Sequence, residues 1–592
     1  MPFQLSETIN KYVAARGKIF LNACPGSGKT TTVAYKLSRL TSEWDKQSGN
    51  YSGIACLSFT NIAKDEIRQK YAEFSNTPLN FPHLVSTIDS FINQYITLPF
   101  FYLFEPNIQR PRIVEDSNII NSAWEIHYNN QKKPLQNQLK NKRNQPLHYS
   151  YPPFDIHIEL NGTFTHAGKV CNPEKVDPDI FKLYCKEVKK WQIRQKGLLA
   201  IHDSAYIAAK ILSDSPRIAM WLANRFPVII IDEAQDTSEI QFDILEKIAP
   251  WLSSLELIGD PFQCLYEWRN ASPEMLVERT QNTDWTVIPL NDNRRSQSKI
   301  IHCFSQLRKK DDAEVKPASP FDVEDPILVV TYSKNCEHHA IAKFLPRIRD
   351  FSDNHVVVRG RSLRDKLLGY KRPSTGKPLW NSSLPEVLIR SKKSFDSHHI
   401  KQGVGQLRAQ LPEIIEPTGD IIQKRKMIDE LKEDYLVNAL LFEIVRNLPS
   451  LELSVSKWSE ETQNYLYQAL NQQFSVKNKI DFQLKSGQYR RFYDQPVEEI
   501  YGERVITEIP VSTIHQVKGM TFDTLLLIMS PDSKGANISV KDVFQSDTFP
   551  SEKQRMIYVA MSRPRYLLAV GVPNETPEET LFQKFGEDVV II

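Results

Sequence analysis

The chain has 592 residues, of which 41% are hydrophobic and 24% charged, with a formal net charge of +3 at pH 7. This length exceeds what one hydrophobic core supports, so we expect several domains, and no run of about 18 apolar residues predicts a membrane span. The seven cysteines contain no CxxC pair, which argues against a zinc ribbon, an iron–sulfur cluster or a disulfide framework. The first residues lack the pattern of a signal peptide, so we expect a cytoplasmic protein without a membrane partner.

The first chemical motif is the loop NACPGSGKTTT, residues 22–32. The run KIFLNA before it predicts a strand, and the apolar spacing after it predicts a helix. In that context backbone N–H groups surround phosphate, Lys29 reaches the terminal phosphates, and the Thr30 hydroxyl can bind Mg²⁺. Ala23 stands where the usual pattern has its first glycine. The predicted nucleotide-binding residues of this loop are Pro25, Gly26, Ser27, Gly28, Lys29, Thr30 and Thr31.

The segment between this loop and the next motif contains two stretches with alternative interpretations. Residues 178–189, PDIFKLYCKEVK, carry the letters of a PD…ExK nuclease, but their helical periodicity argues against that chemistry, which needs carboxylates on paired strands. Residues 154–160, FDIHIEL, place an aspartate, a histidine and a glutamate on one face of a predicted strand. That face is either a metal site or a solvated strand edge.

The second chemical motif, FPVIIIDEAQDTS, joins a predicted buried strand at 228–231 to two carboxylates. Asp232 is placed to hold Mg²⁺, and Glu233 to accept the proton of an attacking water. An ion-paired acidic turn after a core strand is the structural alternative. Together with the phosphate-binding loop, the motif predicts hydrolysis of a nucleoside triphosphate.

Eight motifs in order resemble those of superfamily 1 DNA helicases of the UvrD, Rep and PcrA type. They are ACPGSGKT, LSFTNIAKDEI, STIDSF, IIIDEAQD, IGDPFQCLYEWRNA, LNDNRRSQSKII, VSTIHQVKGMTFD and EKQRMIYVAMSRPR. The resemblance implies an α/β fold with two RecA-like P-loop NTPase lobes, built of parallel sheets flanked by helices, each carrying a mainly helical inserted subdomain. The implied divisions are 1–95 and 200–290 for the first lobe, 96–199 for its insert, 291–365 and 500–592 for the second lobe, and 366–499 for its short insert.

The resemblance also implies roles for residues around ATP and Mg²⁺. Thr30 and Asp232 would hold the metal. Glu233 and Gln263 of the first lobe, with Arg295 and Arg563 of the second, would act on the reacting phosphate, Arg563 as an arginine finger. Arg294 and Gly519 would complete the nucleotide site, although relatives commonly place a tyrosine where this chain has Arg294.

Single-stranded DNA binds by phosphate contacts and by stacking on aromatic side chains. Each aromatic residue taken alone is more often part of a core. The positions that match DNA contacts of the family are Phe59, Thr60, Asn61, Thr87, Ser90, Tyr266, Trp268, Arg269 and His515.

The first functional hypothesis is a DNA helicase that moves 3′ to 5′ on single-stranded DNA and acts at single-strand/duplex junctions. The second is a helicase-like regulatory subunit of a Gabija-like anti-phage system, which senses DNA ends or nucleotides and activates a partner nuclease of the OLD family with little unwinding. The short second insert and the chain end soon after the last motif favour the second hypothesis. A third, a repair or replication-restart helicase, fits the motifs equally well and the short architecture less well.

Overall fold

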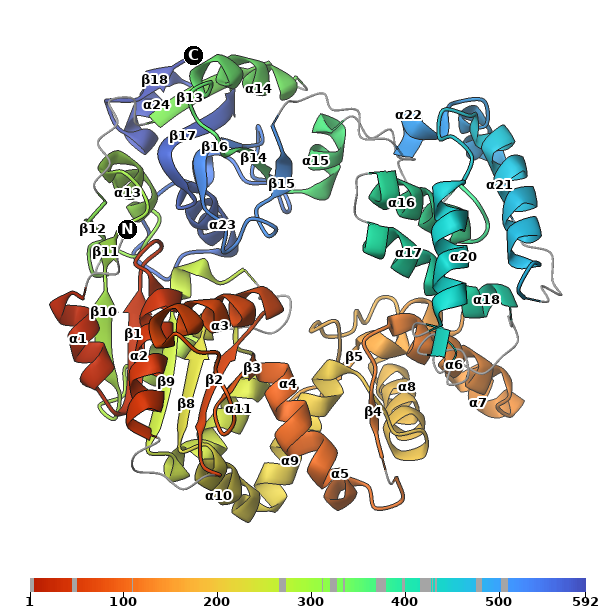
Figure 1. The fold of residues 1–592 in the computed structure, drawn as a ribbon, viewed down its shortest axis with the longest axis horizontal. Coiled ribbons are helices and arrows are strands. Elements are labelled where there is room, and N and C mark those ends of the chain that lie inside the picture. Colours follow the sequence, from red (N-terminus) through yellow and green to blue (C-terminus); the bar gives the residue numbers. More distant parts are fainter. Residues whose placement is uncertain are drawn as a thin grey trace. The chain divides into compact units, whose positions relative to one another are not determined.

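The computed structural model comprises two compact units, Met1–Arg359 with Ser512–Ile592, and Gly360–Val511 (Figure 1). It describes residues 5–592 except 45–50, 109, 266–272, 311, 320–326, 334–335, 369–378, 397–399, 416–426, 428–429, 432–433, 475–481 and 502–508, and it leaves out the side chains of 133–135, 275, 402, 413 and 488. Within these described residues, no helix is long and apolar enough to cross a membrane.

The first unit contains two six-stranded sheets, and the first of them is entirely parallel. Its strands follow one another in the order β10 (Thr286–Leu290), β1 (Gly17–Ala23), β9 (Ser254–Gly259), β8 (Val228–Asp232), β2 (Ile54–Ser58) and β3 (Leu84–Thr87). Every residue of β8 is buried, as expected for a parallel strand covered on both faces.

Helices cover both faces of this sheet. Ile19 and Leu21 of β1 point into one hydrophobic cluster and Phe20 into another, because successive side chains of a strand alternate. The first cluster includes α1 (Glu7–Ala14), α2 (Lys29–Trp44) and α3 (Asn61–Ser75). The second includes α4 (Ile88–Ile92), α5 (Leu98–Phe104), α9 (Ile201–Asp214), α10 (Pro216–Arg225), α11 (Glu239–Ile248) and α12 (Pro273–Thr280).

A fully buried ion pair lies inside the first cluster. Lys36 Nζ of α2 is 2.7 Å from Glu256 Oε1 of β9, and neither residue is exposed to solvent. The same ammonium donates to the carbonyl oxygens of Tyr12 and Ala15 at the end of α1, at 2.9 and 3.0 Å. The pair therefore fastens α1 and α2 to the middle of the sheet.

We expect Lys36→Met to lower the melting temperature of the first lobe by roughly 6 to 20 °C. Removing one partner of a buried pair leaves the other charge uncompensated, which costs about 3 to 5 kcal/mol of the free energy of unfolding. The double variant Lys36→Met/Glu256→Leu should recover most of the loss. Scanning calorimetry measures it, and Lys18→Met is the control, since Lys18 forms an exposed pair with Asp284. Equal melting temperatures for Lys36→Met and Lys18→Met would contradict the prediction.

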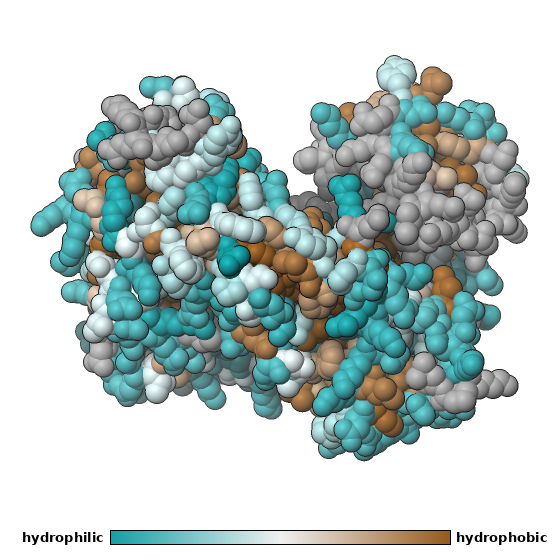
Figure 2. All heavy atoms as spheres, turned by 90° about the horizontal axis from the view of Figure 1, so that it is seen from below, coloured by the Kyte–Doolittle hydropathy of each residue, from teal (hydrophilic) through white to brown (hydrophobic). Residues whose placement is uncertain are grey.

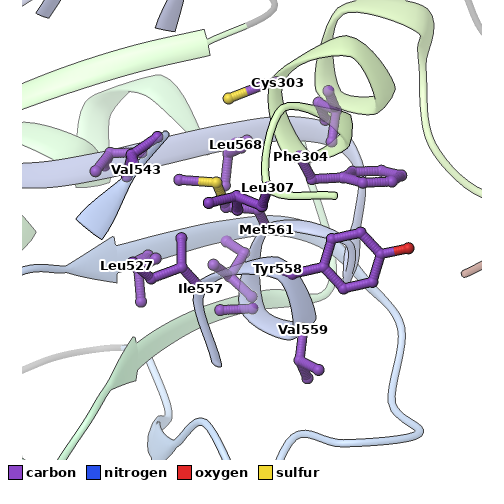
Figure 3. Packing of buried hydrophobic residues seen from close by; sticks show 14 of the residues in the cluster. Cys303, Phe304, Leu307, Leu527, Val543, Ile557, Tyr558, Val559, Met561 and Leu568 are labelled. Atoms are coloured by element: carbon purple, nitrogen blue, oxygen red, sulfur yellow. The ribbon is translucent and has the colours of Figure 1, made fainter. Parts of the chain in front are cut away.

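The second sheet of this unit has the order β15 (Val511–Thr513), β14 (Asn354–Val358), β16 (Phe522–Ile528), β17 (Pro564–Pro573), β13 (Ile327–Tyr332) and β18 (Val590–Ile591). Two helices, α13 (Ser298–Ser305) and α23 (Glu552–Met561), pack against it. Figure 3 shows Phe304 of α13 beside Tyr558 of α23, with Leu568 of β17 close by. Shorter elements around this sheet are β11 (Asp292–Asn293), β12 (Lys316–Pro317), α14 (His338–Phe344) and α24 (Glu578–Phe585).

The insert of the first lobe is mainly helical and has a small aromatic core around Trp124, Tyr184 and Trp191. The predicted helix is confirmed as α8 (Pro178–Lys189), so the carboxylates of the nuclease-like letters lie on a helix rather than on paired strands. The other elements are β4 (Arg112–Ile113), α6 (Ser117–Asn129), α7 (Lys133–Gln138), the antiparallel pair β5 (Ile156–Ile158) and β6 (Phe164–His166), a π-helix (Lys190–Gln195) and β7 (Leu198–Leu199).

The second unit, Gly360–Val511, is mainly helical in its described part and packs around Trp380 and Trp458. Two of its helices are α20 (Tyr435–Arg446) and α21 (Val455–Leu470). The remaining helices are α15 (Arg361–Leu367), α16 (Leu384–Asp396), α17 (Ile400–Arg408), α18 (Leu411–Ile415) and α22 (Val497–Tyr501). Two parallel-sheet lobes with helical inserts confirm the predicted fold class.

Candidate active site

The loop between β1 and α2 has the backbone that a phosphate-binding loop needs. Gly26 and Gly28 have φ angles of +69° and +84°, which favour glycine. A Cβ atom at Gly26 would lie 2.6 Å from Cβ of Arg295, so a larger residue would clash there. A Cβ atom at Gly28 would have no atom within 4 Å, which leaves open space beside the start of α2.

Two side chains at the start of α2 face the carboxylates at the end of β8. Lys29 Nζ is buried, has no hydrogen-bond partner among the described residues, and lies 3.6 Å from Glu233 Oε1. The Thr30 hydroxyl donates to Asp232 Oδ2 at 3.4 Å. A hydroxyl and a carboxylate oxygen this close are ligands of the kind that Mg²⁺ prefers. These four residues fit a phosphate group with its metal ion.

Burial and neighbouring charges shift the pKa values of the two carboxylates, Asp232 and Glu233, in opposite directions. Burial and the charge of Glu233 raise the pKa of Asp232 to about 7, so a divalent cation would relieve a real electrostatic cost there. Burial also acts to raise the pKa of Glu233, but Lys29 and Lys518 outweigh it and lower that pKa. Glu233 is therefore ionised at neutral pH, and its φ of +57° is an uncommon backbone conformation for a residue with a Cβ atom.

Two arginines of the second lobe reach the same region. Arg295 donates to the carbonyl oxygen of Ser562 at 3.0 Å, and Arg563 donates to Gln263 Oε1 at 2.8 Å. Burial, with the charge of Arg563, lowers the pKa of Arg295 to about 9, and burial lowers that of Arg563 to about 10. Neither guanidinium pairs with a carboxylate among the described residues. Two desolvated cations that form no ion pair with the described residues fit a polyanion such as a triphosphate.

Gln263 joins the two lobes by hydrogen bonds. Its amide nitrogen donates to Asp260 Oδ2 at 2.8 Å, while its oxygen accepts from Arg563. Tyr558 of the second lobe also donates to Asp260 Oδ2, at 3.1 Å. A movement of Arg563 would therefore be transmitted through Gln263 to the segment that follows β9.

The residues before Arg295 contact the phosphate-binding loop directly. The backbone N–H of Arg294 donates to Gly26 O at 2.9 Å, and its guanidinium donates to Ser27 O at 3.2 Å. Asn293 donates to Pro25 O at 2.7 Å. The predicted residue Thr31 lies on α2 directly after Thr30. Arg294 thus lies beside the loop that would hold phosphate.

Sequence reasoning missed Asn293, and it also missed a buried ion pair between Lys518 Nζ and Asp236 Oδ2. All three residues lie within the quoted motifs, close to predicted site residues, and this position is their only signal in the sequence. Gly519, which follows Lys518, has a φ angle of +84°.

The predicted DNA contacts that the structure describes gather mainly at one edge of the first sheet. Ser58 of β2 pairs with Thr87 of β3, so Phe59, Thr60 and Asn61 lie near Thr87 and Ser90. Thr60 accepts from the N–H of Ala63 at the start of α3, and Thr87 accepts from that of Ser90 at the start of α4, both at 3.2 Å. His515 is half-buried after β15. Tyr266, Trp268 and Arg269 lie outside the described residues.

Comparison with known proteins identifies two family models and several relatives. The UvrD/REP helicase N-terminal domain matches residues 5–284, and the UvrD-like helicase C-terminal domain matches residues 494–574. A probable DNA helicase II homolog of Mycoplasma capricolum is 24% identical over 48% of this chain and 38% of its own length. The ATP-dependent DNA helicase PcrA of Staphylococcus aureus is 20% identical over 94% of this chain and 81% of its own. The ATP-dependent DNA helicase Rep of Buchnera aphidicola is 21% identical, over 67% and 59%.

Proposed function

Because this chain belongs to the UvrD-type superfamily 1 helicases, we propose that it is an ATP-driven DNA helicase that moves 3′ to 5′ along single-stranded DNA and opens duplex at single-strand/duplex junctions. The direction comes from the family. The observation that best supports a motor is the hydrogen-bonded link from Asp260 through Gln263 to Arg563, since it connects the two lobes at the candidate active site. We place this activity in the cytoplasm.

In this proposal each lobe contributes one half of the hydrolytic site. Lys29 binds the terminal phosphates, and Thr30 with Asp232 holds Mg²⁺, which neutralises phosphate charge when it is bound. Glu233 accepts the proton of the attacking water. Arg563 stabilises the charge that develops on the transferred phosphate, because a guanidinium can donate two parallel hydrogen bonds to it.

Arg295 and Arg294 hold the second lobe against the nucleotide in this proposal. Their backbone lies next to Gly26, and the Arg294 side chain already contacts the carbonyl of Ser27. Thr31 and Gly519 complete the proposed nucleotide site.

DNA coupling in this proposal starts in the segment that follows Asp260. The segment that holds Gln263 continues into Tyr266, Trp268 and Arg269, and the end of the first sheet adds Phe59, Thr60, Asn61, Thr87 and Ser90, with His515 from the second lobe. A change at Gln263 on hydrolysis would thus be passed to the residues that grip the strand.

We expect Trp268→Ala to weaken binding of single-stranded DNA by about 5- to 150-fold while basal ATP hydrolysis is retained. Loss of one base stack costs about 1 to 3 kcal/mol. Fluorescence anisotropy with a labelled dT oligonucleotide measures the affinity, and hydrolysis without DNA is the internal control. Unchanged affinity would show that Trp268 packs in a core instead.

The proposed function is tested by the rate of ATP hydrolysis with and without single-stranded DNA. A motor of this kind should hydrolyse ATP slowly alone and much faster with poly(dT), because lobe closure depends on both ligands. Hydrolysis that poly(dT) leaves unchanged would contradict the proposal.

The alternative from the sequence is a regulatory subunit of a Gabija-like antiviral defence complex that activates a partner nuclease. Such a subunit would have the same nucleotide site, but it would activate a nuclease instead of separating DNA strands. Two results together would favour this alternative: the isolated chain separates strands weakly, and adding an OLD-family partner produces nuclease activity. Strong strand separation by the isolated chain would favour the helicase.

A further inference from the structure

One side of α10 carries three large side chains in a row. Arg217, Trp221 and Arg225 are four residues apart, so they lie along one face with about 6 Å of helix rise between neighbours. Trp221 is 53% exposed, Arg217 is exposed, and Arg225 is half-buried. A tryptophan is usually well covered in a folded chain, so this degree of exposure between two arginines needs a reason.

Two further aromatic rings extend this row. The ring of Phe100 on α5 lies 6.3 Å from that of Trp221, and the guanidinium of Arg225 lies 5.2 Å from the ring of Phe81. Phe81 is 69% exposed. We call Phe81, Phe100, Arg217, Trp221 and Arg225 the α10 stripe. Helix α10 lies at the lower edge of Figure 1, and Figure 2 shows that side of the molecule, where hydrophobic side chains reach the surface between hydrophilic ones.

The two arginines of the stripe carry positive charges that no described carboxylate pairs with. Neither Arg217 nor Arg225 forms an ion pair within the described part of the chain, and Nη1 of Arg225 is buried there without an acceptor. Burial lowers the pKa of Arg225, which shows that its charge is partly desolvated. A bound anion would offset that cost.

The stripe lies at the opposite end of the sheet from the candidate active site. Phe81 comes three residues before β3 and Arg225 three residues before β8, whereas Asp232, Phe59 and Thr87 lie at or just after the other ends of their strands. Since the strands are parallel and about five residues long, the two edges are about 16 Å apart. The stripe is therefore separate from the proposed path of the translocated strand.

We propose that the α10 stripe is a second binding site for single-stranded DNA. A base would stack on Trp221, and the flanking phosphates would contact Arg217 and Arg225. Alternating aromatic and cationic groups suit this ligand because every base has a face that stacks and every linkage carries a charge. An acidic protein segment could satisfy the arginines but would gain less from an open aromatic face.

The test is the number of short oligonucleotides that the full chain binds. With fluorescein-labelled (dT)10 at low salt, we expect two per chain for the unaltered protein and one for Arg217→Ala/Trp221→Ala. The affinity of the second site should fall by roughly tenfold or more for Trp221→Ala alone. DNA-stimulated ATP hydrolysis should persist in both variants, because the residues of the candidate active site are untouched.

Matched controls separate this site from general surface effects. Tyr435→Ala removes an aromatic residue of the second unit that is 82% exposed, and Arg39→Ala removes an exposed arginine, and both variants should still bind two oligonucleotides. If the double variant Arg217→Ala/Trp221→Ala fails to fold, Arg217→Glu takes its place, because Arg217 is exposed. One oligonucleotide per chain for the unaltered protein, or two for Arg217→Glu, would overturn the proposal. The result is distinct from failure of the proposed function, which would appear as ATP hydrolysis that DNA does not stimulate.

Discussion

Replacing Glu233 by glutamine should lower the rate of DNA-stimulated ATP hydrolysis by roughly 10²- to 10⁴-fold, the usual loss when a general base is removed. The amide keeps the shape of the side chain, so ATP should still bind. The ionised carboxylate lies 3.6 Å from Lys29 and accepts a hydrogen bond from Gln235, which holds it at the end of β8.

The measurement is kcat and KM for ATP at saturating poly(dT). We expect Glu233→Gln to lose kcat and Lys29→Ala to lose nucleotide binding, because one change removes a proton acceptor and the other a phosphate contact. Glu239→Gln, an exposed residue in the first turn of α11, is the matched control. If Glu233→Gln kept more than a tenth of the activity, Glu233 would not be the base.

Replacing Arg563 by alanine should lower kcat by roughly 10³- to 10⁵-fold, the range found when an arginine finger is lost. The guanidinium is 2% exposed, desolvated and free of any carboxylate partner within the described residues, so it is prepared for a developing negative charge. Lysine should not restore the rate, because it lacks the planar pair of donors.

The control for this variant lies two residues along the chain. Arg565 is 46% exposed and lies 3.4 Å from Asp523, so Arg565→Ala should change kcat little. The melting temperature of each variant separates loss of stability from loss of catalysis, since Arg563 also donates to Val559 O. A loss of less than tenfold in a stable Arg563→Ala protein would assign Arg563 a structural role only.

The sequence predicted the parts of the site that depend on short segments. The phosphate-binding loop and the carboxylates after β8 could be placed because strand, loop and turn each follow from neighbouring residues. The helix at 178–189 followed from its periodicity for the same reason, and it ruled out the paired strands that nuclease chemistry needs.

Contacts between distant segments could not be predicted from one sequence. Lys518 and Asp236 are 282 positions apart, and Asn293 and Pro25 are 268 apart, so no local pattern marks them as neighbours. Lys36 has the ordinary position of a lysine on an amphipathic helix, and only the fold shows that it is buried against Glu256. Trp221 is of a residue type that is usually well covered in a folded chain, yet the structure exposes it.

Strand separation on tailed duplexes tests the proposed function most directly. The purified full chain, with ATP and Mg²⁺, is given a duplex with a 3′ single-stranded tail or the same duplex with a 5′ tail. We expect separation of the 3′-tailed duplex only, and none with Glu233→Gln. Separation of the 5′-tailed duplex alone, or of neither duplex while ATP is being hydrolysed, would contradict a 3′-to-5′ helicase.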